Sequence, residues 1–330
     1  MKMMLDIEID PPKETIDHSQ KIFLTGSCFT EHIGGMLEDL KFNVIQNPNG
    51  ILFDPNSVSQ SLISYVHNKQ YAETDLFYLN EVWNSWFHHS RFSGLNKDIV
   101  LENINASQRK AHEYLKTTDW LIITLGTSFS YRLVENRTGV ANCHRAPAQW
   151  FDKHLMTIEE INISLDSCLH QLFAFNPSLK IIFTVSPVRH IRDGVMENNR
   201  SKARLIEVVH HLVNKFDKLY YFPSYELVID VLRDYRFYDI DLVHPNYQAT
   251  TFVLQKFIEY FVHESSRTLI PEIQKIITAF RHKSFQPSTE AHQKFLQIHF
   301  EKTKELLKRY PHINFEKELE HFGKFENLRI

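Results

Sequence analysis

The part of the chain most informative about its fold is Lys21-Ile22-Phe23-Leu24-Thr25-Gly26-Ser27-Cys28-Phe29-Thr30. It begins with a short apolar run, and after it apolar residues recur at helical spacing at Ile33, Met36, Leu37 and Leu40. This order predicts a strand, a tight turn and a helix. Such a turn presents a small side chain at the end of the strand, and it aims the free N–H groups of the new helix at the same point.

The same alternation continues along the chain and predicts the fold class. Apolar runs of strand length lie at residues 22–25, 44–45, 120–124, 181–185 and 219–222, and helical patterns at 57–66, 106–115, 158–173 and 201–216. Strands that alternate with helices favour a parallel sheet covered by helices on both faces, an α/β fold of three layers. Continuous apolar strands such as Leu121-Ile122-Ile123 fit burial on both sides.

Two insertions and a tail interrupt this alternation. Residues 77–92 are rich in aromatic side chains, and residues 129–143 resemble a hairpin around Asn136-Arg137-Thr138-Gly139, placed to shape the mouth of a pocket. We expect helices at 273–280 and 291–307, with Pro271, Pro287 and Pro311 separating the helices of this tail. The predicted division is an α/β domain over residues 1–265 and a helical C-terminal extension over residues 266–330.

Composition excludes several classes of protein. The chain has 330 residues, 43% of them hydrophobic and 13% aromatic, which suffices for a large core and argues against disorder. A net charge of −3 without a basic stripe predicts no nucleic-acid partner, and no apolar run is long enough for a membrane span. Acidic residues interrupt the first segment, so it lacks the apolar core of a secretory signal. Three cysteines without a CxxC pair predict reduced thiols and a cytoplasmic location.

A second motif supplies the partner for the turn. In Asp241-Leu242-Val243-His244-Pro245, the spacing lets the Asp241 carboxylate orient the His244 imidazole. A small nucleophile and an oriented base are the minimum for acyl transfer. Two structural interpretations compete with this one. Cys28 can simply fill the gap between turn and sheet, and Asp241 can cap a helix that has Pro245 in its first turn.

Several of these stretches together resemble the GSCFA family. The resemblance rests on Gly26-Ser27-Cys28-Phe29-Thr30, with Thr30 in place of the usual alanine, and on four further motifs in the same order. These are Asn47-Pro48-Asn49-Gly50-Ile51-Leu52, Asn142-Cys143-His144, Thr184-Val185-Ser186-Pro187-Val188-Arg189-His190, and Tyr235-Arg236-Phe237-Tyr238 leading into Val243-His244-Pro245. The family is related to SGNH/GDSL hydrolases, which implies a flavodoxin-like sheet and hydrolysis of esters or other acyl compounds.

The resemblance also implies site residues. Matched on Gly26 and Thr30, the nucleophile of the SGNH pattern falls on Cys28, while superfamily chemistry favours the hydroxyl of Ser27; Asp241 and His244 match the Asp-x-x-His element. The backbone N–H of Gly50 is the expected oxyanion donor. The Gly-x-Asn-Asp block is absent after the strand at 120–124, and either Ser128 or Asn142 takes the place of its asparagine, or activity is weak or lost.

We therefore expect a hydrolase or acyltransferase that acts on an ester, such as an acylated sugar or a cell-envelope precursor. The alternative is a ligand-binding or scaffold protein that keeps the hydrolase architecture without turnover. His144, Arg189 and His190 are further candidates for substrate contact, although a salt bridge to Asp193 competes for Arg189. No HExxH or CxxC spacing indicates a metal, so we expect no cofactor. Asn198-Asn199 and Ser201-Lys202 are expected to open and cap a helix.

Overall fold

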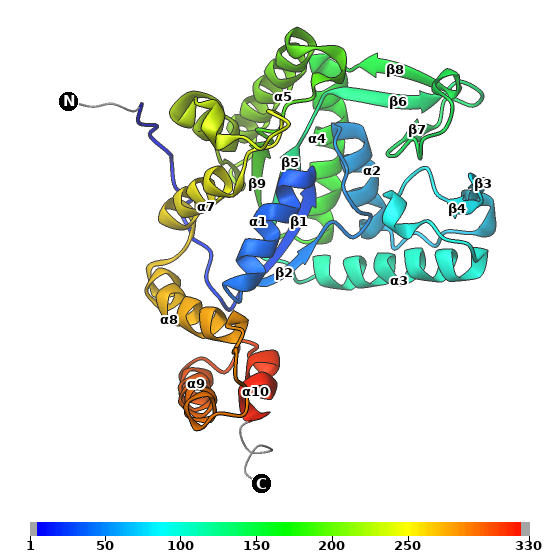
Figure 1. Cartoon of the computed structure of the whole chain (residues 1–330). Coiled ribbons are helices and arrows are strands. Elements are labelled where there is room, and N and C mark those ends of the chain that lie inside the picture. Colours follow the sequence, from blue (N-terminus) through cyan, green and yellow to red (C-terminus); the bar gives the residue numbers. More distant parts are fainter. Residues whose placement is uncertain (1–4, 325–330) are drawn as a thin grey trace.

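The computed structural model describes residues 5–324, and a parallel sheet lies at the centre of this range (Figure 1). Its strand order is β10-β9-β5-β1-β2, and every neighbouring pair runs parallel. This is the flavodoxin-like order, which confirms the predicted fold class. The strands are β1 Lys21–Gly26, β2 Asn43–Gln46, β5 Trp120–Leu125, β9 Lys180–Val185 and β10 Leu219–Tyr221.

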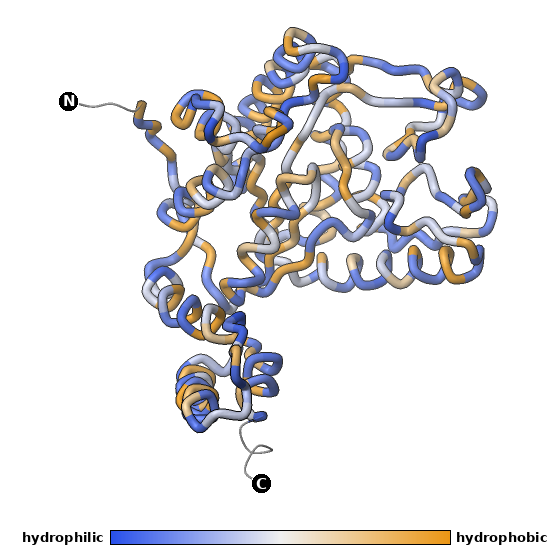
Figure 2. Tube along the Cα trace, in the orientation of Figure 1, coloured by the Kyte–Doolittle hydropathy of each residue, from blue (hydrophilic) through white to orange (hydrophobic). Residues whose placement is uncertain are grey.

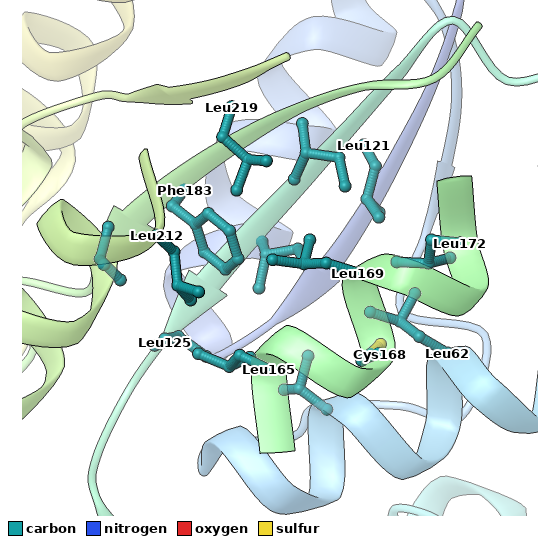
Figure 3. Close-up of a cluster of buried hydrophobic side chains, with 14 of the residues drawn as sticks. Leu62, Leu121, Leu125, Leu165, Cys168, Leu169, Leu172, Phe183, Leu212 and Leu219 are labelled. Atoms are coloured by element: carbon teal, nitrogen blue, oxygen red, sulfur yellow. The ribbon is translucent and has the colours of Figure 1, made fainter. Parts of the chain in front are cut away.

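Helices cover both faces of the sheet because side chains alternate along each strand. On β1, Ile22 and Leu24 belong to the apolar cluster of α1 and α7, whereas Phe23 belongs to the cluster of α2 to α5. Figure 3 shows part of the second cluster, with Phe183 and Leu121 of the sheet close to Leu169 and Leu212. The covering helices are α1 Cys28–Asp39, α2 Pro55–Val66, α3 Lys97–Leu115, α4 Ile158–Phe175, α5 Val195–Lys215 and α7 Tyr247–Phe261.

The two insertions form small sheets at one side of the molecule (Figure 1). The first holds the hairpin of β3 Phe77–Leu79 and β4 Val82–Asn84. The second holds β6 Phe129–Leu133 and β7 Gly139–Val140, whose antiparallel pairing confirms the predicted hairpin. A further strand, β8 Phe151–Leu155, pairs with the other edge of β6 and was not expected from the sequence.

The C-terminal helices α8 Glu264–Arg281, α9 Glu290–Arg309 and α10 Glu316–Phe322 lie at one end of the molecule (Figure 1). They share an apolar cluster of their own, and Lys41 beside α1 reaches Glu318 of α10 at 2.7 Å. The boundary expected after residue 265 falls in the first turn of α8 and stays a prediction. The expected helix break at Pro271 is wrong, because Pro271 lies inside α8 on its exposed side. Proline has no N–H group, and at this position solvent can donate a hydrogen bond to the carbonyl of the preceding turn instead.

The remaining helical residues connect the sheet to α7. A short helix, α6 Ser224–Glu226, continues as a π-helical segment, Leu227–Leu232. Figure 2 shows apolar and polar residues mixed along the outer helices, as expected where each helix has one buried side. Over the described residues, no helix combines the length and the apolar character needed to cross a membrane.

Candidate functional site

The turn after β1 is held rigidly at the carboxyl edge of the sheet. Gly26 has φ +137°, and a Cβ there would lie 2.1 Å from the carbonyl oxygen of Thr124, so no other residue fits without a shift of the backbone. The Gly26 N–H donates to Asn47 Oδ1 at 2.9 Å, and the Ser27 N–H donates to the Thr124 carbonyl at 3.0 Å. The turn is thereby fixed to both neighbours of β1, at the point where strand order reverses and open α/β sheets bind ligands.

Ser27 and Cys28 point into different surroundings. Ser27 occupies the N-cap position of α1 but is 1% exposed, and its Oγ has no hydrogen-bond partner in the described structure. Cys28 is only partly buried, and the N–H groups of Cys28 and Phe29 at the start of α1 face its sulfur. Burial raises the pKa of the Cys28 thiol, while these N–H groups and Lys202 act in the opposite direction. Of the two residues, Cys28 is the one that solvent and a substrate can reach.

Asp241 and His244 form a carboxylate–imidazole pair. Asp241 Oδ2 lies 2.6 Å from His244 Nδ1, and Asp241 Oδ1 accepts the N–H groups of Val243 and His244 at 2.9 and 3.0 Å. These hydrogen bonds lower the pKa of Asp241 to about 2, the bond to the His244 ring first. Leu242 between them has φ +58°, a conformation that branched L-residues rarely adopt outside functional or strained loops.

The helix-capping interpretation of Asp241 is wrong. Asn246 occupies the N-cap of α7, and its Oδ1 accepts the N–H groups of Gln248 and Ala249 at 3.0 and 3.1 Å. Asp241 instead forms its hydrogen bonds with the backbone of its own loop and with the imidazole ring of His244.

The turn and the Asp241–His244 pair lie at the same edge of the sheet, and within residues 5–324 no hydrogen bond joins them. Over residues 5–324, His244 makes no hydrogen bond to Ser27 or Cys28, and the His244 side chain is 43% exposed. The loop after β9 joins the two sites, because the Arg189 N–H donates to the Val243 carbonyl at 3.2 Å. Next to Arg189, His190 carries a ring whose pKa responds to the charges of both Lys202 and His244.

The three expected oxyanion donors differ in what their polar atoms contact. The Gly50 N–H already donates to the Asn47 carbonyl at 2.7 Å, and Ser128 Oγ donates to the Ser201 carbonyl at 3.1 Å inside the core. Asn142 accepts the His144 N–H through Oδ1 at 2.9 Å, and no residue of the described range bonds to its Nδ2. Among these three, the Asn142 amide is the donor that remains open to a ligand.

A pocket of about 270 Å³ opens beside these residues, between the loop before α2 and the β6–β8 sheet. Asn142 and His190 line it, together with Phe53, His89 and Arg192, but none of Ser27, Cys28, Asp241 and His244 does. Phe53 separates the pocket from the turn, since it packs edge-on against His190 and contacts Gly126, which in turn lies against Ser27. The pocket is therefore a neighbour of the candidate nucleophile rather than its immediate surroundings.

The other predicted contact residues are held by the protein itself. His144 Nε2 lies 2.8 Å from the Ser85 carbonyl, and burial lowers the pKa of its ring. The Arg189 guanidinium lies 4.1 Å from the centre of the Tyr238 ring and donates to the Leu242 carbonyl. The competing interpretation of Arg189, a salt bridge to Asp193, is wrong, because Asp193 pairs with Lys153.

His190 remains close to the candidate site. The backbone N–H of His190 donates to Asn198 Oδ1 at 2.8 Å. Burial lowers the pKa of the His190 ring to about 4, so the ring is neutral at physiological pH. Within residues 5–324, no group of three or more His, Cys, Asp or Glu side chains is arranged to hold a metal ion.

Comparison with protein families agrees with these motifs. The model of the GSCFA family matches residues 21–257. The chain belongs to the GSCFA family. A second model, of the C-terminal domain of GSCFA domain proteins, matches residues 273–327, the region of α8 to α10. No curated protein matches this GSCFA chain.

Solved structures resemble the GSCFA chain only distantly. A carbohydrate esterase family 3 protein from Talaromyces cellulolyticus is 9% identical, with a TM-score of 0.37, over 78% of this chain and 99% of the other. A family 3 carbohydrate esterase from Clostridium thermocellum is 10% identical, with a TM-score of 0.36, over 76% and 98%. An acetyl xylan esterase from Butyrivibrio proteoclasticus is 11% identical, with a TM-score of 0.37, over 75% and 65%.

The sequence analysis assigned the wrong position and role to three polar residues of this GSCFA chain. Asn198, Ser201 and Lys202 were expected to cap a helix, but α5 begins at Val195 after Gly194, and all three lie inside it, at most 3% exposed. Their spacing of three and four residues places them on one face of a helix. This spacing would have indicated a shared face if the helix had been predicted to begin before residue 198. That face turns polar groups, including a lysine, toward the carboxyl edge of the sheet.

Proposed function

We propose that this chain cleaves an ester, or transfers its acyl group, through a covalent intermediate on Cys28. The observation that carries the proposal is the 2.6 Å contact of Asp241 with His244 Nδ1, at the same edge of the sheet as a partly exposed thiol on a helix N-terminus. A carboxylate that holds Nδ1 leaves Nε2 free to exchange protons with a substrate. Within residues 5–324, no hydrogen bond occupies Nε2.

The roles follow from position. His244, oriented by Asp241, takes the proton of the Cys28 thiol as Sγ attacks the acyl carbon, and gives it to the alkoxide oxygen as the carbon–oxygen bond breaks. It then takes a proton from the water that attacks the thioester and returns it to the departing sulfur. The N–H groups of Cys28 and Phe29, with Asn142 Nδ2, stabilise the oxyanion. Ser27 is the rival nucleophile, although it would have to turn out of the interior to attack. Within residues 5–324 no hydrogen bond joins the turn to the His244 ring, and the proposal requires that this bond forms when a substrate is bound, as catalytic hydrogen bonds often do.

The substrate that we propose is a small polar ester such as an acylated sugar or a cell-envelope precursor. The adjacent pocket of about 270 Å³ accommodates a group about the size of one sugar ring, and it offers polar side chains such as Asn142, His89 and Arg192. The cysteines are all free, which fits the reducing cytoplasm that we propose as the location.

A second candidate function is ligand binding without turnover. It is favoured by the absence of a hydrogen bond between His244 and the turn within residues 5–324, and by the occupied Gly50 N–H. On that view the pocket beside Asn142 binds a polar ligand, and Cys28 is an ordinary thiol.

Hydrolysis of p-nitrophenyl acetate combined with intact-mass labelling separates the two functions. Iodoacetamide and a fluorophosphonate are applied to the wild type and to Cys28→Ala, Ser27→Ala and His244→Ala. The proposal expects one label on one turn residue, loss of the activity in the matching variant, and loss in His244→Ala. Hydrolysis that equals background in all four proteins would establish the binding function instead. A fluorophosphonate adduct on Ser27 would reassign the nucleophile.

A further inference from the structure

The loop that carries His244 is a narrow hairpin with an exposed tip. Tyr238 and Pro245 form an antiparallel bridge at its base, and the Asp239 N–H donates to the His244 carbonyl at 2.8 Å. Ile240 at the tip is fully exposed, although its side chain is apolar. The tip therefore gains little stability from apolar burial, and polar contacts must fix the position of the imidazole ring.

The backbone of the tip is strained at Leu242. Its φ of +58° lies in the left-handed region, where the Cβ of an L-residue crowds the following carbonyl. The Asp241 carboxylate compensates in part, because its Oδ1 accepts the N–H groups of Val243 and His244. That carboxylate belongs to the same loop, however, so it shapes the loop without placing it relative to the sheet.

Arg189 supplies the contact from outside the loop. This residue follows β9, its backbone N–H donates to the Val243 carbonyl at 3.2 Å, and its guanidinium donates to the Leu242 carbonyl at 3.2 Å. One residue at the edge of the sheet thus binds two successive carbonyls of the hairpin. Because these carbonyls come directly before His244, both hydrogen bonds act on the segment that sets the direction of the ring.

Aromatic rings hold the guanidinium of Arg189 in this position. It lies 4.1 Å from the centre of the Tyr238 ring and 5.4 Å from that of Tyr235. Tyr238 is 7% exposed and forms the base of the hairpin, so it offers a fixed surface. Over the part of the chain that the structure describes, no carboxylate forms a salt bridge with Arg189. A flat guanidinium suits this combination of a ring face and a carbonyl better than an ammonium does.

Arg189 and its neighbour His190 face different sites. His190 lines the pocket beside Asn142, but Arg189 does not. Arg189 borders a separate cleft of about 300 Å³, together with Tyr235 and Tyr238. The guanidinium is therefore engaged with the hairpin, and it is not directed at a substrate in the pocket beside Asn142.

We propose that Arg189 is a positioning residue, which anchors the His244 hairpin to the carboxyl end of β9 and thereby limits the positions that the imidazole ring can take. Arg189 forms no bond with the substrate and exchanges no proton. Its effect on catalysis passes through His244, because a base that is already held near its reacting position needs less rearrangement when a substrate binds. This catalytic consequence rests on the proposed function, whereas the anchoring of the hairpin does not.

Hydrogen–deuterium exchange tests the anchoring without any assay of activity. Mass spectrometry follows the peptide that covers residues 239–246 in the wild type, in Arg189→Ala and in Arg189→Lys. We expect Arg189→Ala to speed exchange of this peptide by about tenfold, because the backbone hydrogen bonds of the hairpin open more often without their anchor. Arg189→Lys should give an intermediate rate, since a lysine keeps the charge but lacks the flat face and the paired donors.

Arg236→Ala is the matched control. Arg236 comes shortly before the hairpin, its side chain is 73% exposed, and it pairs with Asp234 at 3.1 Å. Within residues 5–324, its guanidinium makes no hydrogen bond to residues 239–245. Exchange of the hairpin peptide in Arg236→Ala should equal that of the wild type, and an equal acceleration in both variants would overturn the specific role of Arg189.

The distribution of exchange separates anchoring from general destabilisation. Faster exchange confined to the hairpin peptide supports the proposal. Wild-type exchange in Arg189→Ala, or faster exchange in all peptides alike, would overturn it. Should Arg189→Ala fail to fold, Arg189→Lys takes its place, and the same two outcomes decide.

Steady-state kinetics separate this inference from the proposed function. In an active enzyme, Arg189→Ala should lower kcat for p-nitrophenyl acetate by about 10–100-fold and leave KM within about twofold, because a misplaced base weakens the transition state and not substrate binding. A raised KM with unchanged kcat would make Arg189 a substrate-binding residue and overturn the proposal. A loosened hairpin in a protein without esterase activity would keep the anchor and remove the proposed function. Unchanged kcat and KM would keep the function and overturn the positioning role.

Discussion

The buried cluster of Ser27, Gly126 and Lys202 and the Asp241–His244 pair lie at the same edge of the sheet, but only the first is removed from water. Lys202 and Ser27 are each 1% exposed, whereas the side chains of Asp241 and His244 are 46% and 43% exposed. Burial alone brings the pKa of Lys202 down to about 7. Asp241 owes its low pKa to hydrogen bonds in a loop that remains in contact with solvent.

The two regions therefore contribute differently to folding stability and to chemistry. Changes in the buried cluster alter folding stability as well as chemistry, because an interior charge or an unpaired polar atom carries a large free-energy cost. Changes in the exposed pair alter chemistry and leave stability nearly constant, because solvent screens its charges. Four measurements test this contrast.

The largest expected effect is catalytic and comes from the exposed pair. Asp241→Asn and His244→Ala should each reduce kcat/KM for p-nitrophenyl acetate by about 10³–10⁴-fold, since the first disturbs the imidazole tautomer and the second removes the acid–base group. The melting temperatures should stay within about 2 °C of the wild type. A variant that melts much earlier would show that the pair supports the fold and would break the contrast.

Next in size is the effect of a side chain in the turn. Gly26→Ala should destabilise the protein by at least about 3 kcal/mol, because the new Cβ meets the Thr124 carbonyl at 2.1 Å in a backbone conformation with φ +137°. Gly35→Ala in α1 is the matched control. No atom lies within 4 Å of its Cβ, so it should stabilise the helix by about 0.5–1 kcal/mol. Denaturant unfolding measures both, and equal effects would refute the rigid turn.

The pH dependence of stability sharpens the buried side of the comparison. The pKa of Lys202 is about 7 in the folded protein and near its ordinary value in the unfolded chain, so above pH 7 the unfolded state binds the additional proton. The free energy of unfolding of the wild type, relative to Lys202→Met, should therefore rise by up to about 1.4 kcal/mol per pH unit between about pH 7 and 8.5.

Below pH 7 the difference between the two proteins should level off, because Lys202 is then protonated in both states. Unfolding in urea at half-unit steps of pH measures the slope. A difference that stays flat from pH 6 to 8.5 would mean that Lys202 keeps its proton in the folded protein.

The smallest effect belongs to an exposed ion pair. Arg281 of α8 lies 2.5 Å from Asp39 of α1, with side chains 59% and 45% exposed. Arg281→Ala should change the free energy of unfolding by less than about 1 kcal/mol, and 0.5 M salt should remove the difference. A larger, salt-resistant loss would indicate that this contact holds the C-terminal helices to the α/β domain.

Sequence analysis anticipated most of the sheet because its strands carry strong local signals. The runs at residues 22–25, 120–124 and 181–185 are apolar apart from one threonine in each, so both the strands and their burial were evident. It missed β8 and the start of α5. The β8 residues, Phe151–Leu155, are only half-buried and lack an apolar run, and Gly194 begins α5 without a capping side chain. Pro271 does not break α8, because it lies on the exposed side of the helix, where solvent can bond the carbonyl that lacks an N–H partner.

Local signals in the chain predicted the α/β alternation, the glycine turn and the spacing of Asp241 and His244, since these depend on local periodicity and on contacts within a few residues. Long-range packing, by contrast, sets the inward direction of Ser27, the hydrogen bonds of Gly50 and Ser128 within the protein, and the burial of Lys202 between the ends of β5 and β9. Those outcomes depend on which side of each helix and loop is desolvated by distant segments, and desolvation has no local signature in the chain.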